Sequence, residues 1–69
     1  MFNETELKVQ MTRCGVTNQE VAKALGIDES TLYRKIKADG RFTRSEINTL
    51  IDFLRIEDPR AIFFAEELA

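Results

Sequence analysis

The stretch 16–36 constrains the fold most, because it carries the start and stop signals of two short helices in immediate succession. Thr17 and Glu20 have the spacing of a capping box, in which each side chain accepts a hydrogen bond from a backbone amide at the start of a helix. Gly26 can take the left-handed conformation that ends a helix, and Asp28 can cap the next one. The sequence therefore predicts two helices joined by a turn of about three residues.

Apolar residues within these two predicted helices, at about 18–25 and 29–37, recur with helical spacing and would face a common core. They are Val21, Ala22, Leu25, Leu32 and Ile36. With Ala22 at the helix crossing, Gly26 in the turn and Ile27 after it, this pattern resembles the helix-turn-helix of the Cro and lambda-repressor class of phage regulators. The resemblance implies an all-α, lambda-repressor-like fold that binds double-stranded DNA.

The segment before the motif has the pattern of another helix, and Gly15 supplies its stop signal. Its apolar side chains repeat at helical spacing: Leu7, Met11 and Cys14. We expect this helix to run from Asn3 or Thr5 to about Cys14. We interpret Cys14 as a buried small side chain rather than a reactive thiol. Phe2 either folds back onto the helix or stays loose.

Two more start signals follow the motif. Thr43 and Glu46 form a second capping box, so a helix should begin at about residue 44. Its inward stripe would consist of Ile47, Leu50, Ile51 and Leu54. Asp58 can cap a helix, and Pro59 after it has a ring that fixes φ near the helical value at the first helical position. This pair predicts a fifth helix through about Glu67.

Sixty-nine residues are enough for one small hydrophobic core. We therefore expect a single compact domain of five helices over residues 1–69. Within it, the helix-turn-helix core would span 17–37 and the C-terminal helix 59–67.

Several residue types needed for common catalytic and metal sites are missing. The chain has no histidine and one cysteine, so it lacks the parts of a hydrolytic triad or a zinc finger. We expect no enzymatic activity, no cofactor and no metal. The chain also has no basic start followed by an apolar run and no apolar run of membrane length, so we expect a cytoplasmic protein without a membrane partner.

The net charge of −2 is unusual for a nucleic-acid-binding protein, so the distribution of charge matters more than its sum. Residues 29–44 contain five basic and two acidic side chains, a net charge of +3, whereas residues 45–69 contain two basic and six acidic ones, a net charge of −4. The basic residues lie on the second helix of the motif and the loop after it. They form either a surface for nucleic acid or an ordinary solvated face.

The second helix of the motif would be the recognition helix, and we expect Gly40 to end it. Leu32 and Ile36 must face the core, which leaves the opposite side to meet DNA. Arg34 is the strongest candidate, because its planar fork can bond O6 and N7 of a guanine together. The resemblance implies that DNA contacts come from this helix, the start of the preceding helix and the following loop: Asn18, Gln19, Glu29, Ser30, Tyr33, Arg34, Lys35, Lys37, Arg41 and Arg44.

Several of these residues also have simpler interpretations. Asn18 and Gln19 either help the first amides of their helix to hold a phosphate or are ordinary polar residues of a first turn. Tyr33 either contacts DNA or packs along its own helix. Glu29 departs from the neutral polar residues common here in the family. It could accept a bond from cytosine N4 or repel phosphates, but we interpret it as complementing the helix dipole. The two lysines of the recognition helix resemble phosphate anchors, which position a protein without reading sequence.

The predicted fifth helix is unusually apolar. Adjacent Phe63 and Phe64 point about 100° apart on a helix, so one small core is not expected to hold both rings. The ring left outside would join neighbouring apolar side chains in a patch that a second copy could cover, giving a weak homodimer. The candidate interface consists of Ile62, Phe63, Phe64 and Leu68. The alternative is that this helix folds back and buries both rings.

Two functions from different classes fit these features. The first is a sequence-specific transcription regulator of phage or prophage type that binds operator DNA as a dimer. The second is a helix-turn-helix protein that binds and modulates another phage repressor, which the acidic balance and Glu29 favour. Because the basic cluster at residues 29–44 favours DNA, the first is our working hypothesis.

Overall fold

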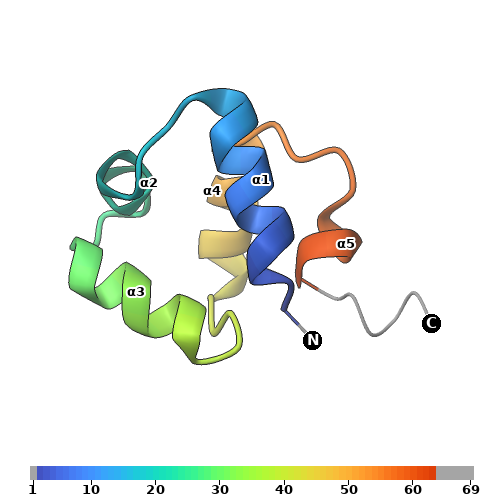
Figure 1. The fold of residues 1–69 in the computed structure, drawn as a ribbon. Coiled ribbons are helices and arrows are strands. Elements are labelled where there is room, and N and C mark those ends of the chain that lie inside the picture. The colour runs from blue at the N-terminus through green and yellow to red at the C-terminus, as the bar shows by residue number, and fades with distance from the viewer. Residues whose placement is uncertain (1, 64–69) are drawn as a thin grey trace.

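The computed structural model describes residues 2–63 and folds them into five α-helices connected by short loops (Figure 1). They are α1 (Glu4–Cys14), α2 (Asn18–Leu25), α3 (Glu29–Lys37), α4 (Arg44–Phe53) and α5 (Pro59–Phe63). This architecture confirms the predicted all-helical fold class. The predicted extension of the fifth helix to Glu67 lies outside the described residues. Among residues 2–63, no helix has the length and apolar character needed to cross a membrane.

The starts of the three central helices are capped as the sequence predicts. Thr17 Oγ1 accepts a hydrogen bond from the Glu20 amide at 3.2 Å, and Glu20 Oε1 accepts one from the Thr17 amide at 3.0 Å. Thr43 and Glu46 repeat this box at the start of α4, with distances of 3.1 and 2.8 Å. Asp28 Oδ1 accepts from an amide in the first turn of α3 at 2.8 Å. These bonds satisfy amides that a helix start leaves without a helical partner.

The helix ends agree with the sequence analysis at two glycines and differ at the third. Gly15 and Gly26 end α1 and α2 in the left-handed conformation, with φ of 67° and 73°. We expected Gly40 to end α3, but the C-cap of this helix is Ala38. Asp39 and Gly40 follow in successive left-handed conformations, with φ of 60° and 70°. Gly40 therefore serves the turn after α3, where the chain reverses toward α4.

The hydrophobic core is built from one buried stripe of each helix. α2 packs against α3 and α4, while α1 packs against α5. In Figure 1, α2 and α3 lie on one side of the molecule, α5 on the other, and α1 and α4 between them. The most deeply buried large side chains are Leu7, Val21, Leu32, Leu50 and Leu54. Cys14 is half-buried, and its thiol donates to the carbonyl oxygen of Leu54 at 3.1 Å.

Three phenylalanine rings from distant parts of the chain close the core beside the start of α1. Phe2, Phe42 and Phe63 pack with ring centroids 5.9 to 6.3 Å apart, within the range of favourable aromatic pairs. The Phe2 amide also donates to Asp39 Oδ1 at 3.3 Å. Phe2 thus folds back, and it joins the start of the chain to the loop between α3 and α4.

The residues of α5 described here belong to the core and not to an exposed patch. Ile62 and Phe63 are only 5% and 7% exposed, and the carbonyl of Ile62 accepts from the Asn3 amide at 2.7 Å. Ile62 and Phe63 were expected to help form a dimer interface, but the ring cluster of Phe2 and Phe42 takes up Phe63. The other two candidate interface residues, Phe64 and Leu68, lie outside the described residues.

Candidate nucleic-acid interface

The turn between α2 and α3 sets the orientation of the predicted recognition helix. Gly26 closes α2, and the Ile27 amide donates to the Ala22 carbonyl at 3.0 Å. Ala22 is buried, so its small side chain lets the helices approach closely. Leu32 and Ile36 anchor α3 in the core. Because these two side chains are buried, the opposite side of α3 lies at the surface of the domain.

The middle of the outer face carries a tyrosine and an arginine. Tyr33 is 63% exposed. Arg34 follows it and lies about 200° around the helix from Leu32, directly away from the core. The Arg34 Nη2 atom donates to Thr31 Oγ1 at 3.1 Å, and the guanidinium charge is one of the causes that lower the pKa of Asp28 at the start of α3. Arg34 is exposed and is therefore placed to reach outward from α3.

The start of α3 holds the two smaller polar candidates. Glu29 and Ser30 are both exposed. The Ser30 hydroxyl donates to Asp28 Oδ1 at 3.0 Å, so it would have to leave the cap to donate to a phosphate. Hydrogen bonds from Thr31, and then that from Ser30, hold the pKa of Asp28 below its ordinary value.

The two lysines of α3 are not equivalent, and Lys35 does not lie on the outer face. Its Nζ atom lies 3.1 Å from Glu46 Oε1, and the two side chains are only 24% and 15% exposed. Burial works against ionisation of Glu46, but hydrogen bonds from the Thr43 amide and the Lys35 ammonium outweigh it and leave its pKa below the ordinary value. This ion pair joins α3 to α4, and Lys35 is occupied within the domain.

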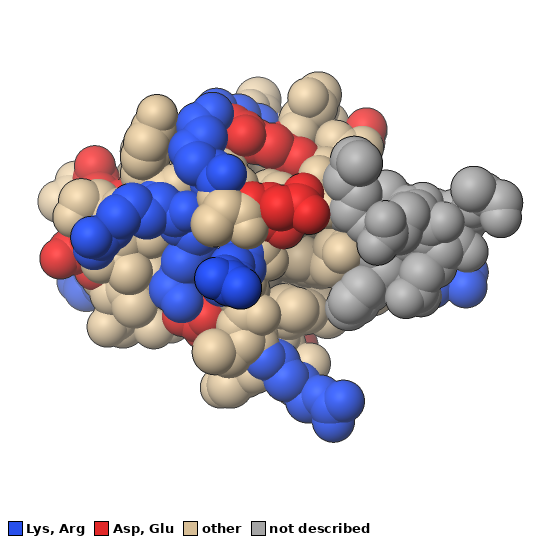
Figure 2. All heavy atoms as spheres, turned by 90° about the horizontal axis from the view of Figure 1, so that it is seen from below, with Lys and Arg blue, Asp and Glu red and all other residues tan. Residues whose placement is uncertain are grey.

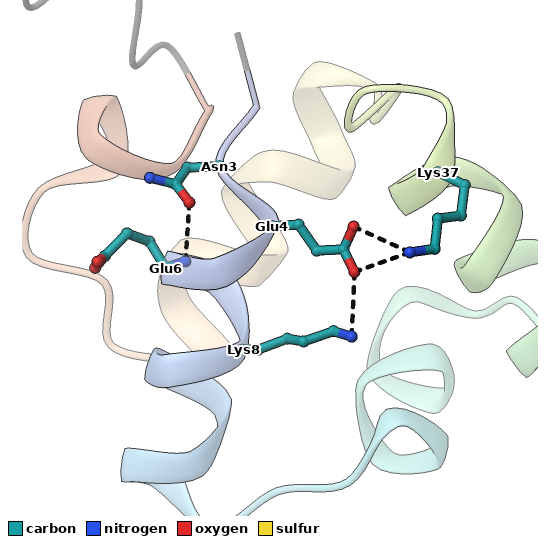
Figure 3. A network of polar contacts seen from close by, with 5 residues as sticks. All are labelled: Asn3, Glu4, Glu6, Lys8 and Lys37. Atoms are coloured by element: carbon teal, nitrogen blue, oxygen red, sulfur yellow. Dashed lines mark hydrogen bonds and ion pairs between the residues drawn. The ribbon is translucent and has the colours of Figure 1, made fainter.

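Lys37 is exposed, but it too has a carboxylate partner from another helix. Its Nζ atom lies 3.2 and 3.4 Å from the two carboxylate oxygens of Glu4, and Lys8 Nζ lies 3.1 Å from the same carboxylate (Figure 3). Hydrogen bonds from Lys8 and Lys37 lower the pKa of Glu4. The Lys37 ammonium also lies 5.6 Å from the centroid of the Tyr33 ring, a cation–π distance.

A recess of about 140 Å³ brings α1, the start of α2 and α3 together. Asn18 lines it, whereas Gln19 is exposed beside it in the sequence. The remaining lining residues include Glu4, Lys8, Glu29, Tyr33 and Lys37. The structure thus gathers four of the predicted DNA-binding residues around one hollow.

The loop after α3 and the first residue of α4 supply further basic side chains. Arg41 and Arg44 are exposed, and Arg41 lines a shallow recess of about 300 Å³ together with Arg34 and Lys35. Figure 2, which views the molecule from the end where α3 leads into α4, shows lysine and arginine side chains gathered with carboxylates among them. Basic side chains therefore gather at this end of the molecule, and acidic groups interrupt them.

Glu4, Lys8 and Glu46 are the site residues that sequence reasoning missed. Glu4 and Lys8 have the i,i+4 spacing of a helical ion pair, which could have been noticed. No local signal connects Glu4 to Lys37, which is 33 residues away. Glu46 was recognised only as half of a capping box. Among residues 2–63, no three potential metal ligands gather in one place.

Comparison with known proteins agrees with this geometry. Residues 11–55, which include all of α2, α3 and α4, match the model of the antitoxin Xre-like helix-turn-helix domain. No curated protein and no solved structure matches the chain. The match covers more than half of the 69 residues and includes the turn between α2 and α3. The chain therefore belongs to the antitoxin Xre-like helix-turn-helix family, a DNA-binding family related to the Cro and lambda-repressor class.

Proposed function

We propose that this protein is a sequence-specific transcription regulator that binds operator DNA with α3 in the major groove. The main support is the way α3 is held, with Leu32 and Ile36 buried and Arg34 directed away from the core. An α-helix about 10 to 12 Å across fits a major groove about 12 Å wide. The resemblance to Cro-type regulators supports a phage or prophage origin.

The residues of this surface divide into groups with different roles. Arg34 reads base edges, with Ser30 and Tyr33 on neighbouring positions of α3. Arg41 and Arg44 in and after the loop contact phosphates on one side. On the other side, the first amides of α2, with Asn18 and Gln19, face the backbone. Glu29 complements the dipole of α3. Lys35 supports the interface by tying α3 to α4.

Two copies are expected on a palindromic site. One α3 reads one stretch of groove, and the described domain has a longest dimension of 33 Å. This dimension is close to the roughly 34 Å between successive major grooves on one side of DNA, so two domains can lie side by side. We propose a weak homodimer that DNA strengthens, with a contact that uses residues other than the buried Ile62 and Phe63.

Substitution of Arg34 tests this proposal. After selection from random duplexes, Arg34→Ala should lose about 1 to 3 kcal/mol of binding free energy on the preferred duplex and should relax its sequence preference. Fluorescence anisotropy titrations measure both effects. The matched control is Arg60→Ala, which removes the same charge from α5, on the far side of the molecule (Figure 1). Equal effects of the two substitutions would show that α3 is not the reading element.

A second candidate function is favoured by the carboxylates on this surface. Glu4 and Glu46 offset the two lysines of α3, and Glu29 is exposed at its start. Such a surface also suits a protein partner. This partner would be another repressor or a toxin, which the word antitoxin in the family's description suggests. The same selection separates the two functions. Failure of the wild-type protein to enrich any duplex, together with retention of a larger repressor in a pull-down that Glu29→Lys abolishes, would favour this candidate.

A further inference from the structure

The carboxylate of Glu4 on α1 pairs with the ammonium group of Lys37, which α3 could otherwise offer to DNA. Both oxygens of Glu4 lie within 3.4 Å of Lys37 Nζ, and one of them also lies 3.1 Å from Lys8 Nζ. Figure 3 shows the two lysine side chains converging on Glu4 from α3 and from α1. One carboxylate thus partly neutralises two cations from different helices.

This pair lies where a DNA phosphate would approach under the proposed function. Glu4, Lys8 and Lys37 line the same recess as Asn18, at the start of α2. The side chains of Glu4 and Lys37 are 30% and 49% exposed, so water and ions reach the pair. An exposed ion pair is weak and exchanges partners readily. A phosphate can therefore compete for Lys37, but it must displace the carboxylate or stand beside it.

We propose that Glu4 is an affinity-limiting residue, which competes with DNA phosphate for Lys37. This inference rests on the proposed DNA-binding function and deepens it. An ammonium already paired with a carboxylate contributes little counterion release when DNA binds, and a carboxylate close to the backbone repels it. In the wild-type protein, binding then depends mainly on Arg34, Arg41 and Arg44, and its salt dependence is smaller than the number of exposed cations suggests.

The experiment compares Glu4→Gln with Glu6→Gln on the same helix. Both changes remove one negative charge from the first turn of α1, but Figure 3 shows Glu6 directed away from Lys37. Anisotropy titrations of a random duplex at several salt concentrations measure the affinity and its salt slope. Glu4→Gln should raise the association constant about fivefold at 0.15 M salt and steepen the log–log salt slope by about 0.9, the effect of one added phosphate contact. Glu6→Gln should change both quantities much less.

A second pair of variants shows whether the gain passes through Lys37. In a Lys37→Ala background, Glu4→Gln should lose most of its advantage over Glu6→Gln. Circular dichroism and thermal melting establish that each variant is folded. If Glu4→Gln and Glu6→Gln are equal in the wild-type background, or if Glu4→Gln weakens binding, the competition is refuted while the proposed function stands. If the folded wild-type protein binds no duplex at any salt concentration, both are refuted.

Discussion

Replacing Gly40 by alanine should destabilise the domain more than the same change at the other glycines. Gly40 lies in the turn after α3 with φ of 70°, a region that costs a residue with a Cβ about 1 to 2 kcal/mol. A Cβ at this position would also lie closer than 3.0 Å to the Cβ, Cγ and Cδ1 atoms of Phe2. The added methyl group would therefore meet the aromatic cluster as well as an unfavourable backbone conformation.

The size of the effect follows from these two contributions. If Phe2 stays in place, the overpacking costs typically about 1 to 3 kcal/mol. If the ring moves out, the domain loses the burial of a phenylalanine, about 1.5 to 3 kcal/mol. Either route, added to the backbone strain, predicts a loss of about 2 to 5 kcal/mol from the free energy of unfolding. This is a large part of the stability expected for so small a domain.

Urea denaturation followed by circular dichroism measures this loss, and Gly26→Ala is the matched control. Gly26 has nearly the same φ, 73°, but a Cβ built there meets no atom within 4 Å. Gly26→Ala should therefore cost only the backbone strain, about 1 to 2 kcal/mol. The difference between the two variants isolates the contact with Phe2. Equal losses for Gly40→Ala and Gly26→Ala would refute the conclusion that Phe2 packs against this turn.

Two further predictions concern a helix cap and a contact between helices. Hydrogen bonds lower the pKa of Asp28 in the folded protein, so the ionised side chain stabilises the domain above its unfolded pKa of about 4. This stabilisation is lost as the pH falls through the folded pKa. In urea denaturation, the wild-type protein should therefore exceed Asp28→Asn in free energy of unfolding by more at pH 7 than at pH 3. An advantage independent of pH would contradict this assignment. Gln10 donates a hydrogen bond to the carbonyl of Leu54 at 2.7 Å, so Gln10→Ala should lower the free energy of unfolding by about 1 kcal/mol. The control is Gln19→Ala at an exposed position, which should change this free energy by less than about 0.5 kcal/mol. Equal values for these two variants would show that the bond to Leu54 adds no stability.

The sequence by itself determined the helices, because their limits depend on interactions between residues that are close in the chain. The capping boxes at Thr17 and Thr43 each join residues three positions apart, and the left-handed glycines act within a single turn. The bounds of α2 and α3 therefore agree with the predicted ranges. Helical periodicity likewise sufficed to predict that Leu32 and Ile36 are buried and that Arg34 is exposed. The turn after α3 was less predictable, because its shape follows from where the chain has to go next.

Only the tertiary structure decided which charges remain available on the surface and which rings the core contains. Lys35 and Lys37 look alike in the sequence, yet one meets Glu46 from α4 and the other meets Glu4 from α1. Periodicity tells which face of a helix turns inward, but it does not tell which neighbouring helix borders each flank. Phe63 is buried for the same reason, since the Phe2 and Phe42 rings that pack against it come from the start of the chain and from the loop before α4. Such contacts arise when helices pack, because packing brings together side chains that no local interaction connects.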